Sequence, residues 1–228
     1  MWNTAATVTG QLVSLKNKKM KGETTVKSKY ENIYVIGEIN GDYEKFQDVW
    51  QQLAVQPQQD LVVFLGNYIG TGDGNGEMMS WLLEHQKDDN LVFIEGVNES
   101  FMYTAEVVAD ETEENFAEIK SVWREELGGF EVECAMDEQA DVGKFYEDWY
   151  EFMRRIHRNR KYEMQDESGK LIFVHQNLRN RYNEPNATVF DTDFLKDSDI
   201  VKKSAHPRRQ LVAYEIRKKK FYIPKTDS

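Results

Sequence analysis

The sequence predicts an α/β fold, because short apolar runs end in glycine-containing loops and are followed by segments with helical periodicity. The three clearest apolar runs lie at residues 33–36, 61–65 and 91–94. Uninterrupted apolar strands of this length belong to a sheet that is covered on both faces. Strands, loops and helices in alternation are typical of α/β architecture.

Two amphipathic helices are expected after the first two runs. The first has apolar residues at the spacing of a helix with one buried face, namely Phe46, Val49, Trp50 and Leu53. The second follows the glycine-rich loop at 70–76, and its inner face is expected to consist of Met78, Trp81, Leu82 and His85. This alternation places the three loops at the carboxyl ends of the strands, where α/β folds carry their chemistry.

The middle of the chain is predicted to be helical and acidic. Helical patterns run from 105 to about 126 and from 138 to about 158, and strand signals return at 171–174, 211–214 and 221–223. We therefore expect a polar, lysine-bearing arm at residues 1–29 and a single domain at 30–228, with a helical insertion at about 105–160.

Composition restricts the class of partner. The chain has 29 Lys and Arg against 40 Asp and Glu, a formal net charge of −11. This charge argues against binding to nucleic acid or to an anionic membrane, and it favours a protein partner with a basic or neutral surface. The single cysteine, Cys134, fits a reducing compartment, and no apolar run approaches the ~20 residues that span a bilayer. A soluble cytoplasmic protein is expected.

The three loops carry the most specific pattern. They read Gly-Glu-Ile-Asn-Gly at 37–41, Gly-Asn-Tyr at 66–68 and Gly-Val-Asn-Glu at 96–99. This layout resembles the calcineurin-like metallophosphoesterases, and within them the lambda-phage and bacterial type of protein serine/threonine phosphatase, whose loops read GDxHG, GDxxDRG and RGNHE. Similar elements occur at Trp123 with Gly128-Gly129 and at Val174-His175. The resemblance covers roughly residues 30–224 and implies a sandwich of two mixed β-sheets flanked by helices.

The resemblance also implies a set of site positions. Such an enzyme holds two divalent cations about 4 Å apart, so that a bridging hydroxide can attack phosphorus. The metal ligands of the family fall on Glu38, Asn40, Asn67, Val97, His175 and His206. The proton donor falls on Asn98, and the two phosphate-binding arginines fall on Thr71 and Glu95.

Most of these positions have lost the side chain that the chemistry needs. An amide at Asn98 cannot act as general acid, which by itself removes on the order of 10²–10⁴ in rate. Val97 offers no ligand atom, and Glu95 is expected to repel a phosphate. Binding of a phosphate ligand without cleavage is disfavoured because the arginines are absent.

These losses predict a catalytically inactive member of the family, a pseudophosphatase that serves as a protein-binding or structural module. No cofactor is expected, or at most one weakly bound divalent metal such as manganese. The alternative is a residual metal-dependent phosphoesterase with an altered single-metal site at Glu38, His175 and His206. Either histidine can also be an ordinary structural residue. Asp42 and Glu99 are expected to cap the helices that follow their loops.

Overall fold

The computed structural model describes most of the chain. The described residues are 29–107, 116–157, 159–175, 187–196 and 211–225. The expected arm therefore lies almost entirely outside them, and so does His206. Among the described residues, no helix is both long enough and apolar enough to cross a membrane.

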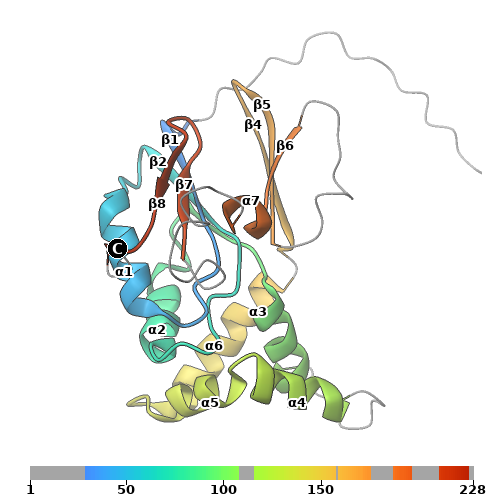
Figure 1. The fold of residues 1–228 in the computed structure, drawn as a ribbon. Coiled ribbons are helices and arrows are strands. Elements are labelled where there is room, and N and C mark those ends of the chain that lie inside the picture. Colours follow the sequence, from blue (N-terminus) through green and yellow to red (C-terminus); the bar gives the residue numbers. More distant parts are fainter. Residues whose placement is uncertain (1–28, 108–115, 158, 176–186, 197–210, 226–228) are drawn as a thin grey trace, which may run out of the picture.

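Two sheets form the centre of the molecule (Figure 1). The larger sheet has the order β3-β2-β1-β7-β8, in which β1, β2 and β3 are parallel and β7 and β8 are antiparallel additions. Its strands are β1 (Asn32–Ile36), β2 (Asp60–Phe64), β3 (Leu91–Phe93), β7 (Ala213–Glu215) and β8 (Lys220–Tyr222). The smaller sheet has the order β4-β5-β6. Its strands are β4 (Lys161–Asp166), β5 (Gly169–Val174) and β6 (Ala187–Phe190).

The larger sheet is buried on both faces, as its uninterrupted apolar strands predict. Val35 and Val63 point to one face and share an apolar cluster with Phe173 of the smaller sheet. On the opposite face, Phe64 packs with Phe46 of the first helix. The predicted α/β fold with two mixed β-sheets is therefore confirmed.

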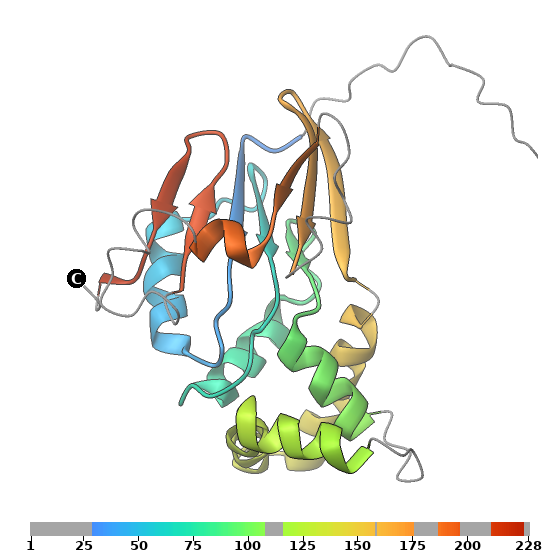
Figure 2. The ribbon, with the colours of Figure 1, turned by 45° about the vertical axis from the view of Figure 1, so that its right-hand side comes forward.

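Helices cover the sandwich and one end of it. The helices are α1 (Tyr43–Leu53), α2 (Asn75–His85), α3 (Val97–Met102), α4 (Phe116–Glu126), α5 (Gly129–Asp137), α6 (Val142–Ile156) and α7 (Thr192–Lys196), with a π-helical turn at Tyr103–Val107. In Figure 2, α3 to α6 lie below the two sheets, at the end where β1, β2 and β3 finish. The loops that follow these three strands therefore lie next to the helical layer.

Some elements differ from the sequence-based expectation. Strands β4 and β6 and helices α5 and α7 were not predicted, and strand β7 begins at Ala213 and not at Leu211. β4 carries charged and half-buried residues, so it lacks the apolar run that identified the other strands. Whether the helical segment is an insertion in a single domain stays a prediction.

One buried carboxylate holds the second and third loops together. Glu99 Oε2 accepts hydrogen bonds from the backbone N–H groups of Asn67 (2.7 Å) and Gly96 (3.0 Å). Glu99 Oε1 accepts hydrogen bonds from Tyr68 N (2.8 Å) and Ile69 N (3.4 Å). Glu99 is thus the expected helix cap, but three of its four bonds reach the neighbouring loop.

Asp42 is also the expected cap, because its Oδ1 accepts a hydrogen bond from Lys45 N at 3.2 Å.

Burial raises the pKa of Glu99 to about 7, although the four N–H groups act in the opposite direction. Glu99 has a relative exposure of 0%.

Replacing Gly129 with Ala is expected to lower the free energy of unfolding by about 1–3 kcal/mol, because the added methyl group has no room. A Cβ atom there would lie 2.6 Å from the Trp123 ring, which is fully buried. Gly143→Ala is the matched control, since a Cβ atom in that exposed helical position meets nothing within 4 Å. That change should stabilise by up to about 1 kcal/mol. Urea denaturation of both variants measures the contrast, and equal effects would contradict the packing described here.

Replacing Glu99 with Gln is expected to destabilise the protein by about 1–3 kcal/mol at pH 5. An NH₂ group in place of Oε2 would face the backbone N–H groups of Asn67 and Gly96 and, unlike either oxygen of a carboxyl group, could not accept a hydrogen bond from them. The pKa of Glu99 is raised from 4.5 in its ordinary state to about 7 in the fold. The folded state therefore holds more protons between these pH values, and the free energy of unfolding falls as pH rises through this window.

Glu99→Gln removes that contribution, so the stability difference between the two proteins should narrow as pH rises from 4.5 to 7. The exposed Glu44 supplies the control, since Glu44→Gln makes the same chemical change outside the loop network. Denaturation curves at several pH values test this, and a constant difference would count against a raised pKa at Glu99.

Candidate functional site

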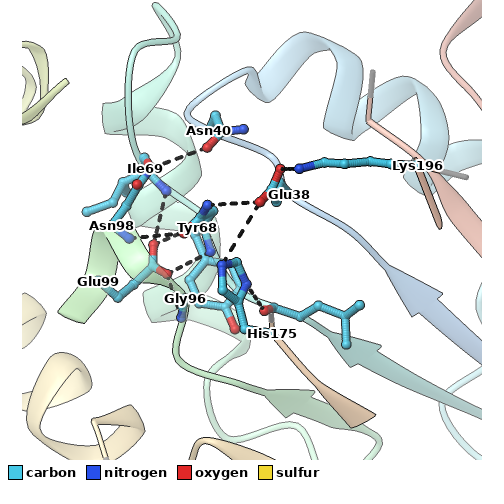
Figure 3. A network of polar contacts seen from close by, with 11 residues as sticks. Glu38, Asn40, Tyr68, Ile69, Gly96, Asn98, Glu99, His175 and Lys196 are labelled. Atoms are coloured by element: carbon cyan, nitrogen blue, oxygen red, sulfur yellow. Dashed lines mark hydrogen bonds and ion pairs between the residues drawn. The ribbon is translucent and has the colours of Figure 1, made fainter. Parts of the chain in front are cut away.

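Five of the predicted site residues gather where the strands end. Glu38 and Asn40 follow β1, Asn67 follows β2, Asn98 lies at the start of α3, and His175 follows β5. Figure 3 shows Glu38, Asn40, Asn98 and His175 around the same region, with Lys196 reaching in from α7. Parallel strands bring their carboxyl ends to one edge of a sheet, which explains why residues from distant parts of the sequence meet here.

The three asparagines are bonded to one another and to the backbone. Asn98 Nδ2 donates hydrogen bonds to Ile69 O (2.7 Å) and to Asn40 Oδ1 (3.2 Å). Asn67 Oδ1 accepts a hydrogen bond from Asn98 N at 3.0 Å. One bond thus joins two side-chain amides, and the other two join an amide to a backbone group, so each bond pairs a polar group of the loops.

Two of these asparagines have a left-handed backbone. Both Asn40 and Asn67 have φ of 54°. Among residues other than glycine, Asn and Asp adopt this conformation most readily. The backbone of the loops thus restricts which side chains the site can carry.

Glu38 is the one carboxylate of the cluster that borders His175. Its side chain is 11% exposed. Glu38 Oε1 accepts a hydrogen bond from Asn67 Nδ2 at 3.2 Å, and Oε2 lies 2.5 Å from Nζ of Lys196. Lys196 was not among the residues predicted from sequence, because no motif marks it.

His175 is held by a hydrogen bond from one ring nitrogen, while the other ring nitrogen faces Glu38. Nδ1 lies 2.6 Å from Leu65 O, and because a carbonyl only accepts, Nδ1 carries the proton. Burial lowers the pKa of His175, although the Glu38 carboxylate acts in the opposite direction. Nε2 is buried, has no hydrogen-bond partner among the described residues, and lies 4.0 Å from Glu38 Oε1.

Two other predicted positions, Val97 and Glu95, do not join this cluster. Val97 is 37% exposed at the first position of α3. Glu95 is buried, and its carboxylate faces His157 Nδ1 (2.7 Å) and Arg160 Nε (3.1 Å). The expectation that Glu95 repels a phosphate is therefore corrected, because its carboxylate is paired with these two side chains. His206 lies outside the described residues.

A pocket of about 450 Å³ opens beside the asparagines. Its lining includes the amides of Asn40, Asn67 and Asn98 and the exposed Thr71, with Asp42, Lys45 and Glu126 as the charged groups. Lys45 pairs with Asp42 at 3.0 Å. The pocket thus offers amide and hydroxyl groups, with its lysine already paired to a carboxylate.

The described donor set does not fit a pair of divalent cations. Hard divalent cations take anionic oxygen and neutral imidazole ligands, and a bridging carboxylate offsets their mutual repulsion. Over the described ranges, no group of three or more His, Cys, Asp or Glu side chains is arranged to hold a metal. At this site one carboxylate and one imidazole stand beside three amides and an ammonium group.

Comparison with known proteins places the fold. The calcineurin-like phosphoesterase family matches residues 31–218 of the 228-residue chain. A search of curated proteins gave no match.

Three solved structures are distantly similar. The first is a candidate diadenosine tetraphosphatase, at 8% identity and a TM-score of 0.43, with 87% of this chain and 95% of that chain covered. The second is a protein serine/threonine phosphatase from Saccharomyces cerevisiae, at 14% identity and a TM-score of 0.40, with 65% of this chain and 38% of that chain covered. The third is a metallophosphoesterase from Sphaerobacter thermophilus, at 15% identity and a TM-score of 0.39, with 66% of this chain and 49% of that chain covered. At these scores the likenesses add nothing to the argument.

The family match carries the assignment, because it spans most of the chain and its three motif loops coincide with the strand ends where the polar side chains meet. Members of the family are metal-dependent phosphoesterases. The protein belongs to the calcineurin-like phosphoesterase family.

Proposed function

We propose that this chain is a catalytically inactive member of the family, a pseudophosphatase that acts as a protein-binding or structural module. The observation that carries the proposal is the closed network at the strand ends. Asn40, Asn67 and Asn98 use their amides to bind one another and the backbone. These side chains stand at the positions where metal binding and proton transfer would require other residue types.

The chemistry of hydrolysis supports this proposal. A two-metal mechanism needs a bridging carboxylate, and Asn67 provides a neutral amide whose Nδ2 already donates to Glu38. Proton donation to a leaving group needs a titratable side chain, and the amide of Asn98 has none. Its Nδ2 is also engaged by Ile69 O. Neither residue can regain its role by a change of rotamer alone.

The features that the chain retains are suited to a binding role. The fold keeps a rigid two-sheet core, and the net charge of −11 favours a protein partner with a basic or neutral surface. Neither nucleic acid nor an anionic membrane suits this charge. The proposed setting is the cytoplasm.

A second candidate is a residual phosphoesterase with one metal. The specific observation in its favour is His175 Nε2, a buried nitrogen that has no hydrogen-bond partner in the described part of the chain and lies 4.0 Å from Glu38 Oε1. A single ion such as manganese between these two side chains, with His206 as a third ligand, would use both groups. Its turnover would depend on metal and would be lost in His175→Ala.

The first test measures metal content by elemental mass spectrometry after dialysis against excess manganese and then against buffer alone. The same sample is assayed for phosphoester turnover. We expect close to zero manganese per chain and no turnover, because the site lacks the anionic ligands that two cations need. About one manganese per chain, together with turnover that disappears in His175→Ala, would establish the second candidate instead.

The binding role has its own test. A native pull-down is expected to recover a stoichiometric partner at low salt, and the complex should weaken as salt rises because screening reduces attraction to an acidic surface. Recovery of no stoichiometric partner under native conditions would argue for a purely structural role. A complex that is insensitive to salt would contradict the expected basic surface.

A further inference from the structure

The Glu38 carboxylate has a positive partner that belongs to the chain itself. Nζ of Lys196 lies 2.5 Å from Glu38 Oε2, and the two side chains are 31% and 11% exposed. A largely buried carboxylate is costly unless a cation is paired with it. In a metal-dependent phosphoesterase the metal ions provide that positive charge. Here the ammonium group provides it.

Helix α7 is built so that Lys196 reaches the site. Asp191 Oδ1 accepts a hydrogen bond from Phe194 N at 2.7 Å and so stabilises the start of the helix. Thr192 N donates a hydrogen bond to His175 O at 3.2 Å, which ties α7 to the strand that carries the histidine. The helix is therefore anchored at its first turn beside the site.

The other end of α7 packs on the first loop. Leu195 is buried, and a Cβ atom at Gly37 would lie only 3.0 Å from Leu195 Cδ1. The absence of a side chain at Gly37 allows this close approach. Leu195 and Gly37 are the immediate neighbours of Lys196 and Glu38, so their contact brings the two charged side chains together.

His175 adds a second acceptor beside Glu38. Its Nε2 lone pair and Glu38 Oε1 are both acceptors, and they face each other at 4.0 Å. Two acceptors at this distance repel unless a donor or cation lies near them. The ammonium group of Lys196 offsets the charge of Glu38 from the other carboxylate oxygen.

We propose that Lys196 is the resident cation of this cleft, in that its ammonium group takes over the charge-balancing role of a divalent metal at Glu38 and disfavours metal binding there. This inference deepens the proposed function and rests on it, because it gives the reason why the remaining carboxylate and imidazole do not recruit a metal.

The test replaces Lys196 with Met, which keeps the length of the side chain and removes its charge. Manganese binding is measured by isothermal titration calorimetry, and the melting temperature is recorded with and without manganese. We expect the Lys196→Met variant to bind manganese at least tenfold more tightly than the wild type, a difference of about 1.4 kcal/mol. Its melting temperature should fall without metal and rise when manganese is added.

Two controls isolate the effect. Lys144→Met removes another paired lysine, the exposed partner of Asp148, and should change neither manganese binding nor its effect on melting. The double variant Lys196→Met with Glu38→Gln removes the carboxylate as well, and should lose both the gain in manganese binding and the rescue by metal. Lys196→Arg keeps the positive charge and should behave as the wild type.

Each outcome decides between the two proposals. A folded Lys196→Met protein that binds manganese no better than the wild type would overturn the role of Lys196 and leave the proposed function intact. A wild type that already holds about one manganese per chain with turnover would overturn both. If Lys196→Met is unfolded, Lys196→Gln is used, and failure of both to fold with or without manganese would mean that a metal cannot replace the lysine.

Discussion

One buried carboxylate holds two loops of the candidate site together, and its hydrogen bonds go to backbone N–H groups. Glu99 accepts hydrogen bonds from four backbone N–H groups, three in the second loop and one in the third. Loops of this length would otherwise leave those N–H groups buried without acceptors, at a cost in stability for each. Because Glu99 acts on the backbone, it holds the loops in place whatever side chains they display. The framework of the site can therefore persist after its reactive groups have changed.

This separation between framework and chemistry explains the character of the cleft. The amides of Asn67 and Asn98 are hydrogen-bonded within the loops while providing neither negative charge nor a titratable proton. Charge balance is provided locally by Lys196 at Glu38 and by Arg160 at Glu95. Both carboxylates have thus acquired cationic partners from the protein. Under the proposed function, the cleft is a polar region whose charges are balanced by the protein's own side chains.

The sequence predicted the elements whose burial is visible in the local pattern of apolar residues. β1, β2 and β3 are buried on both faces and read as apolar runs, and α1 shows the periodicity of one buried face. β4 was missed because its exposed and charged residues carry no such signal. The meeting of Glu38, Asn40, Asn67, Asn98 and His175 followed from their place after strands. The pairing of Lys196 with Glu38 and of Glu95 with Arg160 could not be predicted, because neither Lys196 nor Arg160 lies in a motif loop.

The left-handed backbone at Asn67 has a consequence for how such a site can diverge over evolutionary time. With φ of 54°, the position tolerates Gly, Asn and Asp, while a branched or bulky side chain would strain the loop. An exchange between Asp and Asn is therefore a step that this backbone conformation accepts. It removes a charge and leaves the chain's path unchanged. The same geometry keeps the reverse step open, so a lineage that lost hydrolysis at this position would remain a single substitution away from regaining the bridging ligand.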